Sequence, residues 1–295
     1  MFPVRTQGVV LGQDEVTYRV AEVDREPSDD ELQWLKARKV TGLSVGPDLG
    51  SRRVFPLGWV GELDRIRFVE IVTSRPAGPM PVETVRRLEV LWVQGRLRSP
   101  LDLRDALRLR NLSIAADLVD GSLADAPLLQ HCGLDRQRVF SSSIVDGCGE
   151  LMSVFIAADP RATPEPWDFR MQGTSAIERL TLMNIGARSL DGIAAMPNLR
   201  ELLVAPKVAA GPDERLDLSP LADCPRLTKV VLHDNGTFDN SHVLDDLPEL
   251  TRVTVAAGRA GPHLRDQEWL TVLQAENRRS ASRRATGNCT GTGEA

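Results

Sequence analysis

Aromatic residues are scarce in this chain, and it has neither a long hydrophobic run nor an excess of positive charge. Only 4% of its 295 residues are aromatic. No apolar run approaches the roughly 18 residues of a membrane-spanning helix, so we expect no membrane partner. The net charge of −5 argues against nucleic acid as the main partner, because that partner requires a basic face. The first residues, MFPVRTQGVVLGQDE, lack a sustained apolar stretch, so we expect no secretion signal and a cytoplasmic location.

Cysteine and histidine are also few, with four of each. There is no C-x-x-C pair, and Cys132, Cys148 and Cys224 are expected to pack as small apolar side chains in a reducing compartment. His131 cannot activate Cys132, because adjacent residues of a strand point to opposite faces. The chain has no G-x-S-x-G, P-loop or H-E-x-x-H motif. We therefore predict no catalytic residue, no metal and no cofactor.

A recurring motif of the form L-x-x-L-x-L runs through most of the chain. It is clearest at 199–204, 227–232 and 250–255, which read LRELLV, LTKVVL and LTRVTV. Ten units fit, spaced 20 to 28 residues apart and about 23 on average. We call the first apolar residue of each unit its anchor, and the residues three and five positions later are nearly all aliphatic. The anchors are Val40, Ile66, Leu88, Leu109, Leu129, Leu151, Ile177, Leu199, Leu227 and Leu250.

A second regularity precedes the anchors, where apolar residues recur at every third position. Examples are Leu190, Ile193 and Met196 before Leu199. Threefold spacing is typical of a helical or 3₁₀ turn, whereas the period-two pair after the anchor is typical of a strand. Each unit is therefore predicted to be a turn, a short helix and a strand. One such unit cannot bury its own apolar face, so stability must come from stacking.

This pattern resembles the leucine-rich repeat family in its short bacterial, internalin-like form, over about residues 40–255. The resemblance implies an α/β solenoid with parallel strands on a concave face and short helices or 3₁₀ turns on a convex face. The chain departs from the family at the Asn eight residues after the anchor. Only Asn235 fills that position, so the solenoid is not expected to curve as regularly as in the family. The alternative is an ordinary α/β domain whose units share a period by chance.

The ends of the chain are predicted to cover the repeats. Residues 1–39 are expected to form a cap with a hairpin around residues 12–14 and a helix that starts at Ser28, where S-x-x-E is a capping box. Residues 40–259 form the solenoid, and residues 260–277 form a C-terminal capping helix. Residues 278–295 are expected to be a disordered tail, whose arginines either contact an acidic partner or are simply solvated.

The candidate binding site is the concave face. Side chains alternate across a strand, so residues two, four and six positions after each anchor point outward. Aromatic residues there are candidate anchors of an interface, with polar neighbours that tune specificity. Two alternatives are that a terminal segment covers this face, or that the repeat phase is shifted by one residue. The predicted protein-binding residues are Phe68, Glu70, Trp92, Phe155, Arg179, Glu201, Lys229, His233 and Arg252.

The sequence thus favours a non-catalytic protein–protein interaction module, without indicating the partner or the oligomeric state. One alternative is an enzyme or a small-ligand-binding protein with its site at the edge where three units carry insertions. The insertions span residues 47–53, 157–174 and 205–217, and the second contains Trp167. Surface loops that are merely tolerated would give the same sequence pattern. Another alternative is a structural array that associates with itself.

Overall fold

The computed structural model describes residues 2–11, 14–46, 54–137, 145, 147–159, 176–185, 189–206, 215–233 and 237–256. The chain divides into two units, Met1–Ala256 and Ala257–Ala295, and every described residue belongs to the first. The expected C-terminal helix and tail therefore lie outside the described residues. So do Asn235, Trp167 and most of the three insertions.

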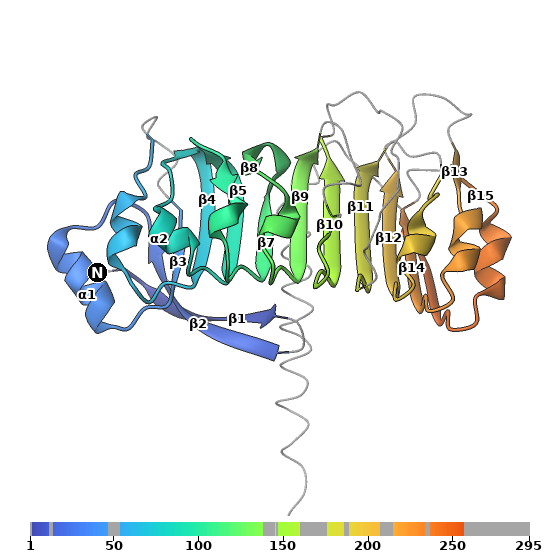
Figure 1. The fold of residues 1–295 in the computed structure, drawn as a ribbon, viewed down its shortest axis with the longest axis horizontal. Helices are drawn as coiled ribbons and strands as arrows, with labels where there is room; N and C mark the ends of the chain where they lie inside the picture. Colours follow the sequence, from blue (N-terminus) through green and yellow to red (C-terminus); the bar gives the residue numbers. More distant parts are fainter. Residues whose placement is uncertain are drawn as a thin grey trace, which may run out of the picture. The chain divides into compact units, whose positions relative to one another are not determined.

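Ten parallel strands form the repeat part of a single twelve-stranded sheet (Figure 1). Each begins two residues after its predicted anchor, so the repeat phase read from the sequence is confirmed in all ten units. Strand follows strand in unit order, which is the topology of a solenoid. The strands are β3 (Gly42–Val45), β4 (Phe68–Ala77), β5 (Val90–Leu97), β7 (Asn111–Ala115), β9 (His131–Gln137), β10 (Ser153–Ala158), β11 (Arg179–Ile185), β12 (Glu201–Pro206), β14 (Lys229–His233) and β16 (Arg252–Ala256).

Short 3₁₀ turns and one turn of α-helix return the chain between these strands. In the unit before β12, the amides of Ile193, Met196 and Leu199 each donate to the carbonyl three residues earlier, at 3.0 Å. This explains the threefold apolar spacing, because a 3₁₀ turn places every third side chain on one side. The turns are η1 (Gly58–Glu62), α2 (Val82–Val85), η2 (Leu103–Asp105), η3 (Ala116–Leu118), η4 (Leu123–Asp125), η6 (Ile193–Ala195), η7 (Ser219–Asp223) and η8 (Ser241–Asp246).

Two small parallel pairs lie beside the turns. They are β6 (Leu101–Asp102) with β8 (Val119–Asp120), and β13 (Arg215–Asp217) with β15 (Thr237–Asp239).

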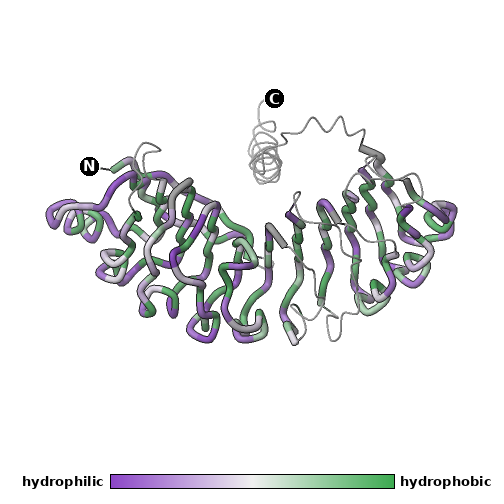
Figure 2. The backbone as a smooth tube through the Cα atoms, turned by 90° about the horizontal axis from the view of Figure 1, so that it is seen from above, coloured by the Kyte–Doolittle hydropathy of each residue, from purple (hydrophilic) through white to green (hydrophobic). Residues whose placement is uncertain are grey.

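In Figure 2 the strands of this unit follow an arc, with the turns on its outer side. We call the inner side of the sheet, opposite the turns, the concave face.

The main core lies between the sheet and the turns. Nine of the ten anchors are buried, and Leu250 packs against the core from a partly buried position. The weakest unit in the sequence also fits, because Leu129, Cys132 and Leu134 are all buried. At the last strand Val253 is 47% exposed, although its position in the repeat faces the core. Among the described helices, none combines the length and the hydrophobicity needed to traverse a bilayer.

The N-terminal segment contains the expected hairpin and helix. The hairpin strands, β1 (Val4–Leu11) and β2 (Asp14–Val23), are antiparallel. Helix α1 (Asp29–Ala37) begins after Ser28, which forms the predicted reciprocal capping box with Glu31. Only the end of β2, Val20–Val23, pairs with β3, and it does so in parallel. The rest of the hairpin leaves the sheet edge and runs across the direction of the repeat strands (Figure 1).

Candidate protein-binding face

The concave face carries two rows of side chains, set by the parallel register of the strands. Equivalent positions lie next to each other on neighbouring strands, which are ~4.8 Å apart. The first row, two residues after the anchors, is Gly42, Phe68, Val90, Asn111, His131, Ser153, Arg179, Glu201, Lys229 and Arg252. The second row, four residues after the anchors, is Glu70, Trp92, Ser113, Gly133, Phe155, Thr181, Leu203, Val231 and Thr254.

The hairpin covers the first part of these rows. Phe68 is 0% exposed and Trp92 is 9% exposed, in a small apolar cluster separate from the main core. The Phe68 ring lies 5.5 Å from the ring of Tyr18 and 5.2 Å from that of Trp92, the latter edge-on at 80°. Such tilted and edge-on contacts are favourable for aromatic quadrupoles. The hairpin supplies Val9, Leu11, Tyr18 and Val20 to this cluster, and the repeats supply Phe68, Val90 and Trp92.

Polar contacts fix the hairpin in the same place. The Tyr18 hydroxyl donates to Glu89 at 2.8 Å, and burial together with this carboxylate raises the pKa of Tyr18 well above its ordinary value. Arg5 of β1 donates to Glu70 at 3.0 Å, and Ser44 donates to the same carboxylate oxygen at 2.8 Å. The Glu70 side chain is therefore only 13% exposed. The bonds of Tyr18 and Arg5 cross between the hairpin and the repeats, so they hold the hairpin in this position.

Gly42 makes this cover possible. It occupies the first row on β3, between Val20 of the hairpin strand and Phe68. A Cβ atom at Gly42 would lie 2.9 Å from Val20 Cγ2 and 3.0 Å from Phe68 Cδ1. Both distances are shorter than ordinary van der Waals contact. The absence of a side chain at this position lets the hairpin strand lie close to the aromatic cluster.

The prediction that Phe68 and Trp92 are exposed is therefore wrong, although their positions in the repeat were predicted correctly. They do face outward from the sheet, but the N-terminal hairpin lies on them, which was one of the two alternatives. Glu70 is likewise occupied by contacts within the chain. The sequence carried a signal for this cover, because Val9, Leu11, Tyr18 and Val20 form an apolar face on a hairpin that must be buried somewhere.

Beyond the hairpin, from β10 to β16, the side chains of the two rows are half-buried or exposed. Phe155 is half-buried, and so are Leu203 and Val231 of the same row. In the first row Arg179 and Arg252 are exposed. The other predicted site residues, Glu201, Lys229 and His233, are half-buried here, and Lys229 pairs with Glu201 at 3.3 Å. We call Phe155, Arg179, Glu201, Leu203, Lys229, Val231, His233 and Arg252 the open face.

Between the covered part and the open face the rows become polar and small. Trp92 donates its indole N–H to Asn111 at 3.0 Å, and His131 follows on the next strand. Burial, and secondarily the positive charge of Arg179, lower the pKa of His131 to about 4. His131 is therefore neutral near pH 7, and the positive charges of the open face begin at Arg179.

The described residues hold little that could perform chemistry. They contain no group of three or more His, Cys, Asp or Glu side chains placed to hold a metal ion. Cys132, Cys148 and Cys224 are buried thiols. Burial raises the pKa of Cys224 to about 11 and raises that of Cys132 further. Thiols in this state are poor nucleophiles.

Comparison with known proteins identifies the fold. An internalin, InlF, from Listeria monocytogenes superimposes with a TM-score of 0.51 at 11% identity, over 78% of this chain and 65% of the internalin. This chain is a leucine-rich repeat solenoid. It spans less than two thirds of the length of that internalin, and at this identity the likeness establishes the fold alone.

More distant leucine-rich repeat structures also match. Internalin C2 of the same organism gives a TM-score of 0.45 at 16% identity, over 75% of this chain and 84% of the internalin. TLR13, in a complex with a single-stranded RNA, gives 0.37 at 13% identity, over 76% of this chain and 45% of TLR13. No family model and no curated protein sequence matches. The leucine-rich repeat assignment thus rests on the repeat pattern and the fold.

Proposed function

We propose that this leucine-rich repeat protein is a non-catalytic interaction module that binds a protein partner on the open face. The observation that carries the proposal is the contrast between the two parts of one sheet surface. The chain buries its outward apolar side chains under its own hairpin over β4 and β5, but leaves Phe155, Leu203 and Val231 half-buried on later strands. Apolar side chains that gather on a solvent-accessible face are a frequent mark of an interface.

The charges beside this row support a partner with an acidic edge. Arg179, Lys229 and Arg252 lie in the first row with a single carboxylate, Glu201, between them. Glu201 already pairs with Lys229, and Arg179 and Arg252 form no ion pair with a described residue. The chain as a whole carries a net charge of −5, so this row is a local reversal of sign. We therefore propose a partner that places an apolar strip on Phe155, Leu203 and Val231 and an acidic edge beside it.

A photo-crosslinking amino acid placed at Leu203 tests where binding occurs. Leu107, which is 54% exposed in the turn before β7, provides the matched control position. We expect a protein from native lysate to crosslink through position 203 and not through position 107. Crosslinks only through position 107 would contradict the proposal, and crosslinks to a second copy of this chain would favour self-association instead.

The crosslinked partner, once purified, permits a quantitative test of the contacts. We expect Phe155→Ala and Arg179→Glu each to weaken its binding at least about tenfold, because contacts near the centre of an interface dominate its affinity. Arg108→Glu makes the same change of charge at an exposed site in the turn before β7. Equal weakening by Arg108→Glu would show that net charge, and not the open face, controls the affinity.

A further inference from the structure

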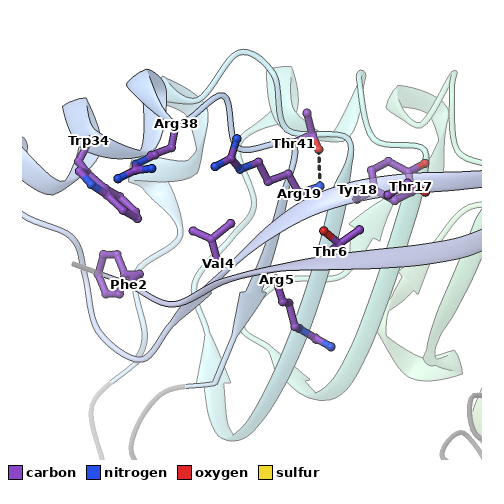
Figure 3. A pocket seen from close by; sticks show the side chains of 10 residues that line it. All are labelled: Phe2, Val4, Arg5, Thr6, Thr17, Tyr18, Arg19, Trp34, Arg38 and Thr41. Atoms are coloured by element: carbon purple, nitrogen blue, oxygen red, sulfur yellow. Dashed lines mark hydrogen bonds between the residues drawn. The ribbon is translucent and has the colours of Figure 1, made fainter.

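A second surface lies away from the open face, where α1 meets the hairpin. A groove of about 710 Å³ opens there, lined by residues of α1, β1, β2 and the turn before β3 (Figure 3). This volume falls within the roughly 300–1,000 Å³ that is usual for small-molecule sites. Among the described residues none that lines the groove is acidic, although the chain as a whole carries a net charge of −5.

Two arginines converge in this groove. Arg19 comes from β2, and Arg38 caps the C-terminal end of α1. Figure 3 shows both guanidinium groups in the space between the helix and the strand, that of Arg38 beside the Trp34 ring. Within the part of the chain that the structure describes, neither group forms an ion pair, whereas Arg5 at the groove's edge pairs with Glu22 and Glu70. Like charges directed at one space repel, so a bound anion would stabilise this arrangement.

The remaining walls offer flat apolar surface and hydroxyl groups. The ring of Trp34 is half-buried, and the Arg38 guanidinium lies 5.4 Å from its centroid. Phe2 lines the groove on the same side as Trp34 (Figure 3). The Thr41 hydroxyl accepts a bond from the Arg19 amide at 2.9 Å, which leaves its own proton free to donate to a ligand. The groove thus combines two cationic forks, a hydroxyl donor and an aromatic wall.

We propose that this groove binds a small phosphate monoester with a planar apolar body. A phosphate monoester carries about −1.5 to −2 charges near pH 7, which matches two guanidinium groups, and its oxygens accept their paired N–H bonds. A carboxylate carries one negative charge and leaves one arginine unpaired. The planar body would pack against Trp34. This site is independent of the proposed protein partner, and its test uses other variants.

Calorimetric titration of the full chain with phenyl phosphate tests this site. We expect Arg19→Ala and Arg38→Ala each to weaken binding at least about tenfold, the loss expected when a charge-assisted bond is removed. Arg38→Lys keeps the charge but loses the fork and should fall between Arg38→Ala and the native chain. Arg108→Ala, which removes the same charge at an exposed site in the turn before β7, should leave the affinity unchanged. Thermal unfolding of each variant confirms that it is folded.

Comparison ligands define the chemistry. We expect inorganic phosphate to bind more weakly than phenyl phosphate, since it lacks the planar body, and benzoate to bind more weakly because it carries one charge. Affinity for phenyl phosphate should fall below about pH 6, where the ester loses its second charge. Benzoate binding as tightly as phenyl phosphate would overturn the assignment to phosphate, and no binding at millimolar phenyl phosphate would overturn the site. If the chain binds a phosphotyrosyl peptide but does not bind phenyl phosphate, the ligand of this groove is a protein and the assignment to a small molecule is wrong.

Discussion

Replacing Trp92 with alanine tests whether the hairpin is held on the concave face by the aromatic cluster. The substitution removes a side chain that is 9% exposed, its edge-on contact with Phe68 and its hydrogen bond to Asn111. Truncation of a buried tryptophan costs about 3–5 kcal/mol. The loss should be concentrated in the hairpin, because the cluster is separate from the main core and β12 to β16 make no contribution to it.

Native-state hydrogen exchange measures where this stability is lost. A cost of about 3 kcal/mol corresponds to roughly a hundredfold loss of protection, expected in the amides of β1 and in those of β2 that pair with it. Amides of β11 and β12 should keep their protection. Phe155→Ala is the matched control, because Phe155 occupies the same row but is only half-buried, and it should cost less than about 1.5 kcal/mol.

The two variants together can refute this account. If Trp92→Ala costs no more than Phe155→Ala and leaves the hairpin amides protected, the cluster does not hold the hairpin. A uniform loss of protection over all strands would instead place Trp92 in a single cooperative core with the repeats.

Three further predictions concern the same surface. Tyr18 is the only tyrosine in the chain, so ultraviolet titration reports its ionisation alone. Because its pKa is raised in the folded protein, we expect no tyrosinate at pH 10–11. Tyrosinate should appear only with alkaline unfolding, since the free energy of unfolding falls as the pH rises above about 10. A normal titration near pH 10 in the folded protein would show that Tyr18 is not buried against Glu89. Burial lowers the pKa of His131 from 6.5 to about 4, so its contribution to stability is complete above about pH 6.5 and is lost as the pH falls towards 4. We expect His131→Gln to flatten the dependence of the unfolding free energy on pH between these values. An unchanged dependence would contradict the burial of His131. Gly42→Ala should destabilise hairpin docking by about 1–3 kcal/mol, because the added Cβ would press on Val20 and Phe68. Gly58→Ala is the control and should cost less, because a Cβ there meets nothing within 4 Å. Urea unfolding measures both costs.

The sequence by itself determined the repeat architecture and its phase. In the first nine units the apolar residues three and five positions after the anchor are buried in the core, because a strand alternates with period two. The apolar residues at every third position before an anchor face the core because a 3₁₀ turn has three residues per turn. These are local geometric rules, so even the unit with Cys132 in place of an aliphatic residue was located correctly. The capping box at Ser28 is local in the same sense.

Only the tertiary structure decided which part of the concave face is available. Phe68, Trp92 and Phe155 all occupy outward positions in the repeat, and nothing in that pattern separates them. The first two are buried because Val9, Leu11 and Tyr18, 50 or more residues away in the chain, lie on them. This contact depends on the length and path of the hairpin, on the room left by Gly42 and on the bonds of Tyr18 and Arg5 to Glu89 and Glu70. Residues so far apart meet only through the folded chain, and periodicity within a repeat carries no information about them.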